Sequence, residues 1–262
     1  MKPIISLITV LLLISCNNEQ KKQVEVSLNE DVPVVSKTYP ENISKIFEVH
    51  GGLANWNTLR SLEFTMNKPK GHEVTLTDLR HRKSFISTDK FKMGYNGLDV
   101  WIKQDSMHYK GNPKFYYNLM FYFYAMPFIL ADDGIIYSDA KPLVFDGKTF
   151  PGIKITYDAG VGESPEDEYI LYYDAETYKM TWLAYTVTFF TKEKGKEFHF
   201  IKYSNWQDVN GLLLPETISW YAYENNKPTE KKSDLKFTDI KVSKDKPNSK
   251  IFEVPEGAII LE

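Results

Sequence analysis

Residues 196–224 read KEFHFIKYSNWQDVNGLLLPETISWYAYE, and this stretch decides the fold class. Two long runs within it, residues 196–207 and 212–224, are rich in aromatic and β-branched side chains, which favour strands. Asn210-Gly211 stands between them, and Asn-Gly is typical of the tight turn between antiparallel strands. The stretch therefore predicts two long strands that pair with each other.

More strands are expected on both sides of this pair, because similar runs alternate with turn residues such as Asn96-Gly97 and Asn225-Asn226. Consecutive antiparallel pairing is the simplest arrangement for them. No internal repeat or linker interrupts the region, so residues 40–262 are predicted to form a single β-rich domain. The other expected strands span residues 62–67, 73–79, 83–88, 91–95, 99–104, 153–157, 169–173, 180–191 and 233–242.

A short helix is predicted to open the domain. Pro40-Glu41-Asn42 is typical of a helix start, and Gly51-Gly52 is typical of a helix end. His50 lies in the last turn, where a donor satisfies a free carbonyl, so its expected role is structural. Residues 53–59 predict a further helical turn that carries Trp56. One face of the first helix would consist of Ile43, Ile46, Phe47 and His50.

The segment 115–130, FYYNLMFYFYAMPFIL, is apolar or aromatic on nearly every side. It is shorter than the roughly 20 residues that a membrane-spanning helix needs, and Pro127 interrupts it. A helix that is apolar all round is normally buried, so the segment predicts a helix packed against a sheet. A pair of buried strands is the alternative, because periodicity does not separate the two in such an aromatic run.

Residues 180–190 predict that the sheet is covered on both faces. Large apolar side chains occur at both alternating sets of positions, with Trp182 on one face and Leu183 and Tyr185 on the other. In a sheet with one solvent-exposed face, apolar and polar residues would instead alternate along each strand. The second face must therefore be covered by a helix, a second sheet or a ligand.

The N-terminus has the features of a secretory signal. Lys2 supplies a positive charge, residues 4–14 are almost all apolar, and Cys16, the only cysteine, follows closely. Leu13-Ile14-Ser15-Cys16 resembles the lipobox of bacterial lipoproteins, which implies that residues 1–15 are removed and that Cys16 is lipidated. A plain secretory signal followed by a free cysteine is the alternative. Residues 16–39, polar with scattered valines, are expected to form a flexible tether to the membrane.

Composition and motifs argue against several functions. The net charge of −3 disfavours nucleic acid as a partner, and a single cysteine excludes an intrachain disulfide and a thiolate metal site. The sequence has no phosphate-binding loop, dinucleotide fingerprint or Gly-x-Ser-x-Gly elbow. Its five histidines show no metal-helix spacing, so no metal and no cofactor are expected. His72 and His81, facing each other across a hairpin, are the one alternative metal site.

The charged clusters have structural explanations. Asp132-Asp133 and Glu166-Asp167-Glu168 lie in polar, turn-like stretches and are expected to be solvated, whereas a catalytic acid needs burial to raise its pKa. Residues 80–83, Arg-His-Arg-Lys, are expected at a strand edge, where charge discourages aggregation. Contact of this basic cluster with anionic head groups or with a carboxylate is the alternative.

Several local patterns resemble a known family. They are His50-Gly51-Gly52 with Trp56, Trp101, Met126-Pro127-Phe128, and Tyr203-x-x-Trp206 before Gly211-Leu212-x-Leu214-Pro215. Over residues 40–262 the chain resembles lipoproteins of unknown function from Bacteroidetes-type bacteria. The strand–turn part also resembles the periplasmic lipoprotein-carrier superfamily, which implies an incomplete antiparallel barrel whose concave face holds helices and acyl chains. An anchored chain looks more like the membrane-bound acceptor of that superfamily than its soluble carrier.

Together these observations predict a mainly β (α+β) fold, a strongly curved antiparallel sheet or incomplete barrel with helices packed in the concave face. The predicted function is non-catalytic binding of a hydrophobic ligand, a lipid or an acylated protein, by a lipoprotein anchored in the envelope at the outer membrane. A scaffold that binds protein or glycan and a hydrolase with an unrecognised site are the alternatives. The residues expected to line the apolar concavity are Trp101, Tyr117, Phe121, Tyr124, Met126, Phe128, Trp182, Tyr185, Phe189 and Trp220.

The lipidation of Cys16 can be tested by itself. Cys16→Ser should abolish it, because a serine hydroxyl is a far poorer nucleophile than a thiol. The variant should leave the membrane fraction, since acyl chains supply the affinity of a lipoprotein for the bilayer. Fractionation of cells labelled with palmitate measures both effects, and a melting curve checks that the soluble form folds. A Cys16→Ser chain that stays in the membrane pellet would contradict the lipobox prediction.

Overall fold

The computed structural model describes residues 37–158, 166–191, 195 and 197–261. The chain divides into two units, Met1–Thr38 and Tyr39–Glu262. The predicted signal peptide, Cys16 and most of the predicted tether lie outside the described residues, so they remain predictions. All the helices and strands named below belong to the second unit.

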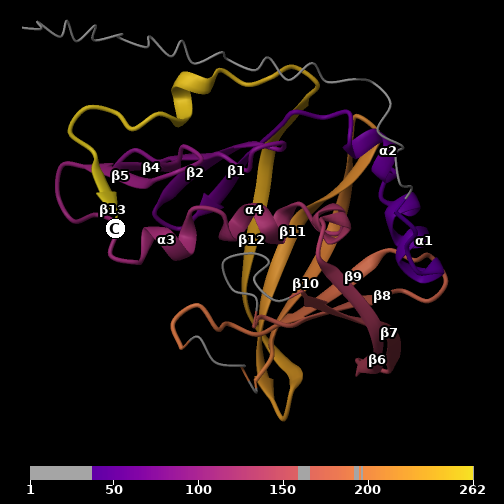
Figure 1. Cartoon of the computed structure of the whole chain (residues 1–262). Coiled ribbons are helices and arrows are strands. Elements are labelled where there is room, and N and C mark those ends of the chain that lie inside the picture. The colour runs from indigo at the N-terminus through magenta and orange to yellow at the C-terminus, as the bar shows by residue number, and fades with distance from the viewer. Residues whose placement is uncertain (1–36, 159–165, 192–194, 196, 262) are drawn as a thin grey trace, which may run out of the picture. The chain divides into compact units, whose positions relative to one another are not determined.

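A single antiparallel sheet of 13 strands forms the second unit (Figure 1). Its order is β13-β5-β4-β3-β2-β1-β12-β11-β10-β9-β8-β7-β6, and its two end strands do not pair with each other, so the sheet is unclosed over the described residues. This confirms the predicted mainly β, antiparallel fold. The strands are β1 (Ser61–Lys68), β2 (Gly71–Asp78), β3 (Ser84–Ser87), β4 (Phe91–Tyr95), β5 (Val100–Gln104), β6 (Ile135–Phe145), β7 (Lys148–Tyr157), β8 (Tyr169–Tyr173), β9 (Met180–Tyr185), β10 (His199–Val209), β11 (Leu212–Glu224), β12 (Lys227–Ser243) and β13 (Ile259–Leu261).

The β10–β11 hairpin confirms the prediction from its sequence. Val209 pairs with Leu212 across Asn210 and Gly211, whose φ angles are 54° and 79°. Positive φ at both central positions is the geometry of a type I′ turn, which Asn and Gly adopt at little cost. The tight turn therefore fixes the register of the β10–β11 hairpin in the middle of the sheet.

The predicted strands all occur; β4, β8 and β11 have the predicted ends and the others have changed ends, whereas β6 and β13 were not predicted. The predicted strand 180–191 is too long, since β9 ends at Tyr185. Beyond that point the backbone bonds to the segment before β8 instead of continuing the ladder. Thr186 N–H donates to the carbonyl of Glu168 at 3.0 Å, and Thr188 N–H donates to the Asp167 carboxylate at 2.7 Å.

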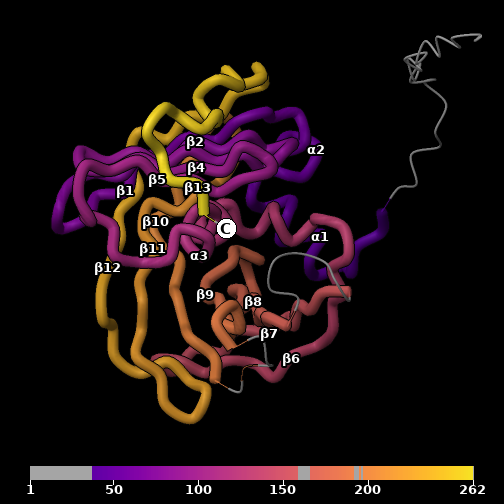
Figure 2. The backbone as a smooth tube through the Cα atoms, turned by 60° about the vertical axis from the view of Figure 1, so that its left-hand side comes forward, coloured from indigo at the N-terminus to yellow at the C-terminus, as the bar shows by residue number. Residues whose placement is uncertain are grey.

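The sheet is strongly curved, as predicted. Figure 2 shows β1–β5 at the top and β6–β9 at the bottom, joined along the left by β10–β12, with α3 between the two groups. The ring of Phe145 on β6 lies 5.6 Å from that of Tyr221 on β11, although four strands separate β6 from β11 in the sheet. In a flat sheet those strands would be about 24 Å apart, at about 4.8 Å per strand. The contact therefore requires the end of the β6–β7 hairpin to fold back over the face of the sheet opposite the main core.

The aromatic segment is helical but broken, so the prediction of one helix over residues 115–130 is wrong in its continuity. It forms α3 (Pro113–Tyr116), α4 (Leu119–Tyr124) and the 3-10 helix η1 (Phe128–Ala131). The first break lies at Asn118, and the second includes Pro127, whose ring is incompatible with a continuing helix. The alternative of two buried strands does not occur.

The main core lies where this broken segment crosses the concave face. Figure 1 shows α4 in front of β11 and β12, and the Tyr124 ring stacks on Phe237 of β12 at 4.5 Å. Phe128 stacks on Trp56 at 4.8 Å, with ring planes 8° apart. Tyr203 on β10 donates its hydroxyl hydrogen to the Phe123 carbonyl at 2.8 Å. Aromatic burial and this hydrogen bond together hold the irregular segment on the sheet.

A second, smaller core covers the other face, which confirms the predicted burial on both faces. Trp182 is fully buried there, whereas its neighbours Leu183 and Tyr185 belong to the main core. The cover is the bent end of the β6–β7 hairpin, because Leu143 and Phe150 belong to this second cluster. A part of the same sheet therefore provides the second layer.

The first helix is locked onto the β10–β11 hairpin. The helix α1 (Glu41–Val49) ends at His50, whose backbone carbonyl accepts a 2.9 Å hydrogen bond from Leu213 N–H. The His50 ring donates Nδ1–H to the carbonyl of Ile46 at 2.7 Å and lies 4.6 Å from the ring of Trp206. The chain then turns at Gly51, whose φ is 108°, and continues into α2 (Leu53–Trp56). His50 thus has the structural role predicted for it.

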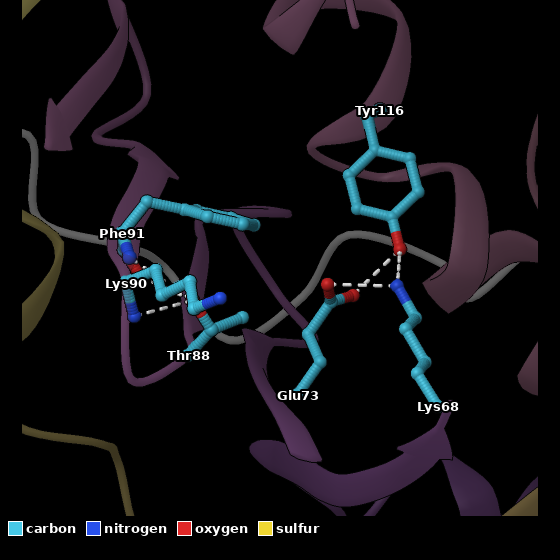
Figure 3. A network of polar contacts seen from close by, with 6 residues as sticks. All are labelled: Lys68, Glu73, Thr88, Lys90, Phe91 and Tyr116. Carbon is cyan, nitrogen blue, oxygen red and sulfur yellow. Dashed lines mark hydrogen bonds and ion pairs between the residues drawn. The ribbon is translucent and has the colours of Figure 1, made fainter. Parts of the chain in front are cut away.

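A buried polar network ties α3 to the sheet (Figure 3). The carboxylate of Glu73, which is 3% exposed, accepts hydrogen bonds from Lys68 Nζ at 2.7 Å and from the Tyr116 hydroxyl at 2.6 Å. Lys68 Nζ also contacts that hydroxyl. Thr88, also drawn in Figure 3, closes the neighbouring β3–β4 turn by accepting from Phe91 N–H at 3.0 Å. All three network groups are satisfied, so we assign the network a structural role.

Gly51→Ala should destabilise the domain by more than about 1 kcal/mol, because its Cβ would lie 2.1 Å from the Gly211 carbonyl at a positive φ. Gly147→Ala is the matched control, since Gly147 also has a positive φ of 74° but has nothing within 4 Å of the added Cβ. Urea unfolding of both variants measures the difference. Equal losses would contradict the close approach of α1 to the hairpin.

His50 should make the domain less stable as the pH falls. Burial lowers the pKa of His50 from 6.5 to about 4. The unfolded chain therefore takes up a proton below pH 6.5 that the folded chain takes up only near pH 4, so stability is lost across that interval, by up to about 3 kcal/mol. His50→Phe keeps a ring against Trp206 and removes the titration. Unfolding at pH 7 and pH 4.5 should show a smaller pH dependence in this variant than in the native chain.

Candidate functional site

A cavity of about 390 Å³ lies beside the broken aromatic segment. Its walls come from α3, α4 and η1, from the β2–β3 turn, from the end of β7 and from the start of β8. This volume falls within the roughly 300–1,000 Å³ of small-molecule sites. The lining residues are Arg82, Phe115, Tyr117, Asn118, Leu119, Tyr122, Phe123, Ile129, Asp132, Asp133, Ile135, Tyr157, Asp167, Tyr169 and Phe189.

The cavity wall is mainly apolar, since ten of these 15 residues are aromatic or aliphatic. Two of the wall aromatics are tyrosines at the ends of β7 and β8, Tyr157 and Tyr169, whose rings lie 6.0 Å apart. Burial, with smaller contributions from neighbouring tyrosines and carboxylates, raises the pKa of both hydroxyls. Both therefore stay neutral at physiological pH, and the wall gains no charge from them.

Three phenylalanine rings cluster at one side of the cavity. Phe115 lies 5.3 Å from Phe189 and 5.1 Å from Phe190, and Phe189 and Phe190 are also 5.1 Å apart. Phe115 and Phe189 line the cavity, whereas Phe190 is 64% exposed. The apolar wall therefore continues to the molecular surface at this point.

The polar part of the wall is organised by Arg82, from the turn between β2 and β3. Its Nη2 donates to both oxygens of the Asp132 carboxylate, at 2.6 and 2.7 Å, and its guanidinium lies 5.3 Å from the ring centre of Phe121. This ion pair connects the β2–β3 turn to the segment after η1. The basic cluster 80–83 therefore occupies a turn, and one of its members forms the polar wall of the cavity.

Two polar atoms of the wall have no hydrogen-bond partner among the described residues. They are the amide Oδ1 of Asn118, a residue that is 8% exposed, and the Nη1 of Arg82. Both atoms are shielded from solvent. Buried polar groups are normally paired, so an unpaired donor and an unpaired acceptor in one cavity wall point to a ligand that pairs with them.

A second depression of about 430 Å³ lies on the other side of the Arg82–Asp132 pair, beside Arg80 and Asn57. It shares Arg82, Asp132 and Asp133 with the first cavity, but its open surface is mainly polar. A hydrophobic ligand would therefore gain less there than in the first cavity.

Of the ten residues predicted to line the concavity, Tyr117 and Phe189 line this cavity. The others belong to the packed interior, and their role in binding stays a prediction. Trp101, for example, is 1% exposed and donates Nε1–H to the Phe252 carbonyl at 3.1 Å. The residues of the packed interior are Trp101, Phe121, Tyr124, Met126, Phe128, Trp182, Tyr185 and the partly buried Trp220.

Sequence reasoning missed the polar wall. Asp132 and Asp167 come from the acidic stretches that were expected to be solvated, and the structure places both in the cavity lining. Arg82 was noted only as part of a basic cluster. These residues come from segments far apart in the sequence, and no local pattern signals their meeting. Asn118, the polar residue within FYYNLMFYFY, was the one available signal.

The histidines lie away from the cavity, and none is among its lining residues. His81 contacts Asp78 at 3.0 Å in the β2–β3 turn, whereas His72 hydrogen-bonds Asn67 at 2.7 Å in the β1–β2 hairpin. The alternative site built on both is therefore wrong. Over the ranges that the structure describes, no group of three His, Cys, Asp or Glu residues could hold a metal ion. Within the same ranges, no helix has the length and apolar character needed to cross a bilayer.

Solved structures of several other proteins, including the following three, are similar to this chain. A LolA superfamily protein from Nitrosomonas europaea is 12% identical and has a TM-score of 0.45, over 80% of this chain and 96% of that one. A DUF1329 family protein from Desulfovibrio piger is 9% identical, with a TM-score of 0.44 over 77% of this chain and 93% of that one. A candidate outer membrane lipoprotein-sorting protein domain from Vibrio parahaemolyticus is 10% identical, with a TM-score of 0.38 over 77% of this chain and 91% of that one. Because these identities and TM-scores are low, the fold of the chain is assigned from its own strand order.

No curated protein matches the sequence. The family described as a family of unknown function, DUF6503, matches residues 2–246, which is nearly the whole chain. The origin in Bacteroidetes-type bacteria that the sequence patterns suggest stays a prediction. The extent of the match shows that the chain belongs to the DUF6503 family.

Proposed function

We propose that the chain is a non-catalytic lipoprotein that binds a hydrophobic ligand, a lipid or the acyl part of an acylated protein, in the cavity beside α4. The observation that carries this proposal is the apolar wall, ten residues of 15. Transfer of an apolar chain from water to such a wall is favourable by about 25 cal/mol per Å² of buried apolar surface. The same wall offers little to a polar substrate.

The distribution of aromatic residues supports a ligand in a cavity over a protein or glycan on a surface. Among the described residues, the exposed large hydrophobic side chains include two aromatics, Tyr122 and Phe190. Tyr122 lines the cavity, and Phe190 contacts two lining residues, Phe115 and Phe189. A scaffold would present its aromatics as a separate flat patch.

The structural contacts of Asp132 and Asp167, two of the three acids of the wall, support binding rather than catalysis. Asp132 is held by Arg82, and Asp167 accepts a 2.7 Å hydrogen bond from Thr188 N–H. Both carboxylates thus fix the ends of irregular segments around the cavity. A general acid or base would instead need a carboxyl that is available to a substrate.

The proposed location is the cell envelope, at the outer membrane, with lipidated Cys16 as the anchor. The lipobox carries this part of the proposal. Anchoring at a bilayer would keep the cavity close to a source of hydrophobic ligand. The tether of residues 16–39 would supply the reach.

Leu119→Arg should abolish ligand binding, because it places a charge in the apolar wall. Saturable enhancement of N-phenyl-1-naphthylamine fluorescence measures binding to the purified Cys16→Ser chain. Leu98→Arg is the matched control, since Leu98 is 85% exposed and outside the cavity lining. We expect at least about a tenfold loss of affinity for Leu119→Arg and none for Leu98→Arg.

Native mass spectrometry of the protein purified from cells provides the complementary measurement, and a bound lipid or acyl chain is the expected result. Melting curves exclude unfolding as the cause of any loss. The proposal is overturned if the native chain carries no bound lipid and shows no saturable probe binding, or if both arginine variants weaken binding equally while remaining folded.

A further inference from the structure

We infer that the cavity selects an amphiphile whose neutral head group carries both a hydrogen-bond donor and an acceptor, as an acyl amide or a long-chain alcohol does. The inference rests on the proposed function and concerns only the polar end of the ligand. Asn118 and Arg82 carry it, because each contributes a hydrogen-bonding atom to the wall that nothing in the described residues uses.

Asn118 is placed where its amide would ordinarily be used by the protein. It is the N-cap residue of α4, and an Asn at that position normally accepts from a backbone N–H of the first turn. Here the side chain makes no capping hydrogen bond, although the residue is only 8% exposed. Its Oδ1 is therefore an unused acceptor within the wall of a mainly apolar cavity. A ligand with a donor can satisfy it.

Arg82 supplies the complementary donor. Its Nη2 is fully occupied by the two oxygens of Asp132, at 2.6 and 2.7 Å, and its Nη1 is buried without a partner among the described residues. The ion pair holds the guanidinium at the cavity, so Nη1 is available to a ligand acceptor. An acceptor bound there pairs with Arg82, and a donor on the same head group pairs with Asn118.

The existing ion pair favours a neutral head group over an anionic one. The charge of Arg82 is already matched by Asp132, and Asp133 and Asp167 also belong to the lining. The negative charge of a carboxylate head group would therefore be repelled by these carboxylates, whereas a neutral amide or hydroxyl would not be repelled. A bare hydrocarbon would leave both unmet atoms of the wall unpaired.

The head group reaches these atoms by a local adjustment, because both are shielded from solvent in the empty cavity. Rotation of the Asn118 amide costs no hydrogen bond of Oδ1, whereas Arg82 must tilt about its contacts with Asp132 so that Nη1 reaches the ligand. The volume of about 390 Å³ lies within the range of sites for small organic molecules. Ten-carbon amphiphiles are therefore suitable probes.

Displacement of N-phenyl-1-naphthylamine from the Cys16→Ser chain tests the inference. The competitors are decanamide and 1-decanol, which carry a donor and an acceptor, methyl decanoate, which carries acceptors alone, and decanoate, which is an anion. We expect decanamide and 1-decanol to bind about tenfold more tightly than methyl decanoate, the effect of one buried hydrogen bond. Decanoate should bind less tightly than decanamide.

Asn118→Leu should remove this preference, because leucine has a similar size and no acceptor, and it removes no capping bond. Methyl decanoate should bind the variant at least as well as the native chain. Arg82→Lys keeps a charge beside Asp132 and loses Nη1, so it should weaken all three neutral competitors. The side-chain amide resonance of Asn118 should also shift with decanamide and not with methyl decanoate.

Failure of this inference is distinguishable from failure of the proposed function. If decanamide, 1-decanol and methyl decanoate bind equally, or if decanoate binds most tightly, the head-group inference is wrong and the hydrophobic cavity stands. If Asn118→Leu keeps the native preference while remaining folded, the assignment of Asn118 is wrong. If no competitor displaces the probe and the probe itself does not bind, the proposed function has failed.

Discussion

The structure depends on one constraint, that a strongly curved and unclosed sheet has a concave apolar face that must be covered. The chain meets it by laying residues 113–131 across that face between β5 and β6. Aromatic stacking, as between Tyr124 and Phe237, and the hydrogen bond from Tyr203 to the Phe123 carbonyl fix the segment in place. Without this cover, the inner face of the sheet would be open to water, at a cost that grows with each uncovered apolar side chain.

The cavity is a consequence of how that cover is built. A single straight helix could not follow the curve, and the segment breaks at Asn118 and around Pro127. Close packing needs regular, interdigitating elements, and short pieces at different angles leave space between them. The space remains beside α4, where the β2–β3 turn and the ends of β7 and β8 complete the wall. The Arg82–Asp132 pair closes its polar side.

Local sequence was sufficient for most strands and for the central turn, because strand propensity and Asn210-Gly211 act over a few residues. It was insufficient for β6, which carries Pro142 and alternates poorly, as an edge strand can. It was also insufficient for β13, which is three residues long. The cavity wall could not be predicted from local sequence for a different reason, since Arg82, Asn118 and Asp167 meet only through the curvature of the sheet. The apolar residues most strongly signalled by the sequence, such as Trp182, form packed cores instead.

The polar atoms of the wall argue that the cavity is more than a packing defect. A void left by imperfect packing would be lined by apolar groups, because those carry no penalty when they lack a partner. Here the break that ends helical regularity places an amide at the N-cap of α4 without using it as a cap. The turn opposite brings a guanidinium with one nitrogen occupied and one unused. An unused donor and an unused acceptor in one wall weaken the empty state and favour a state in which a ligand supplies both partners.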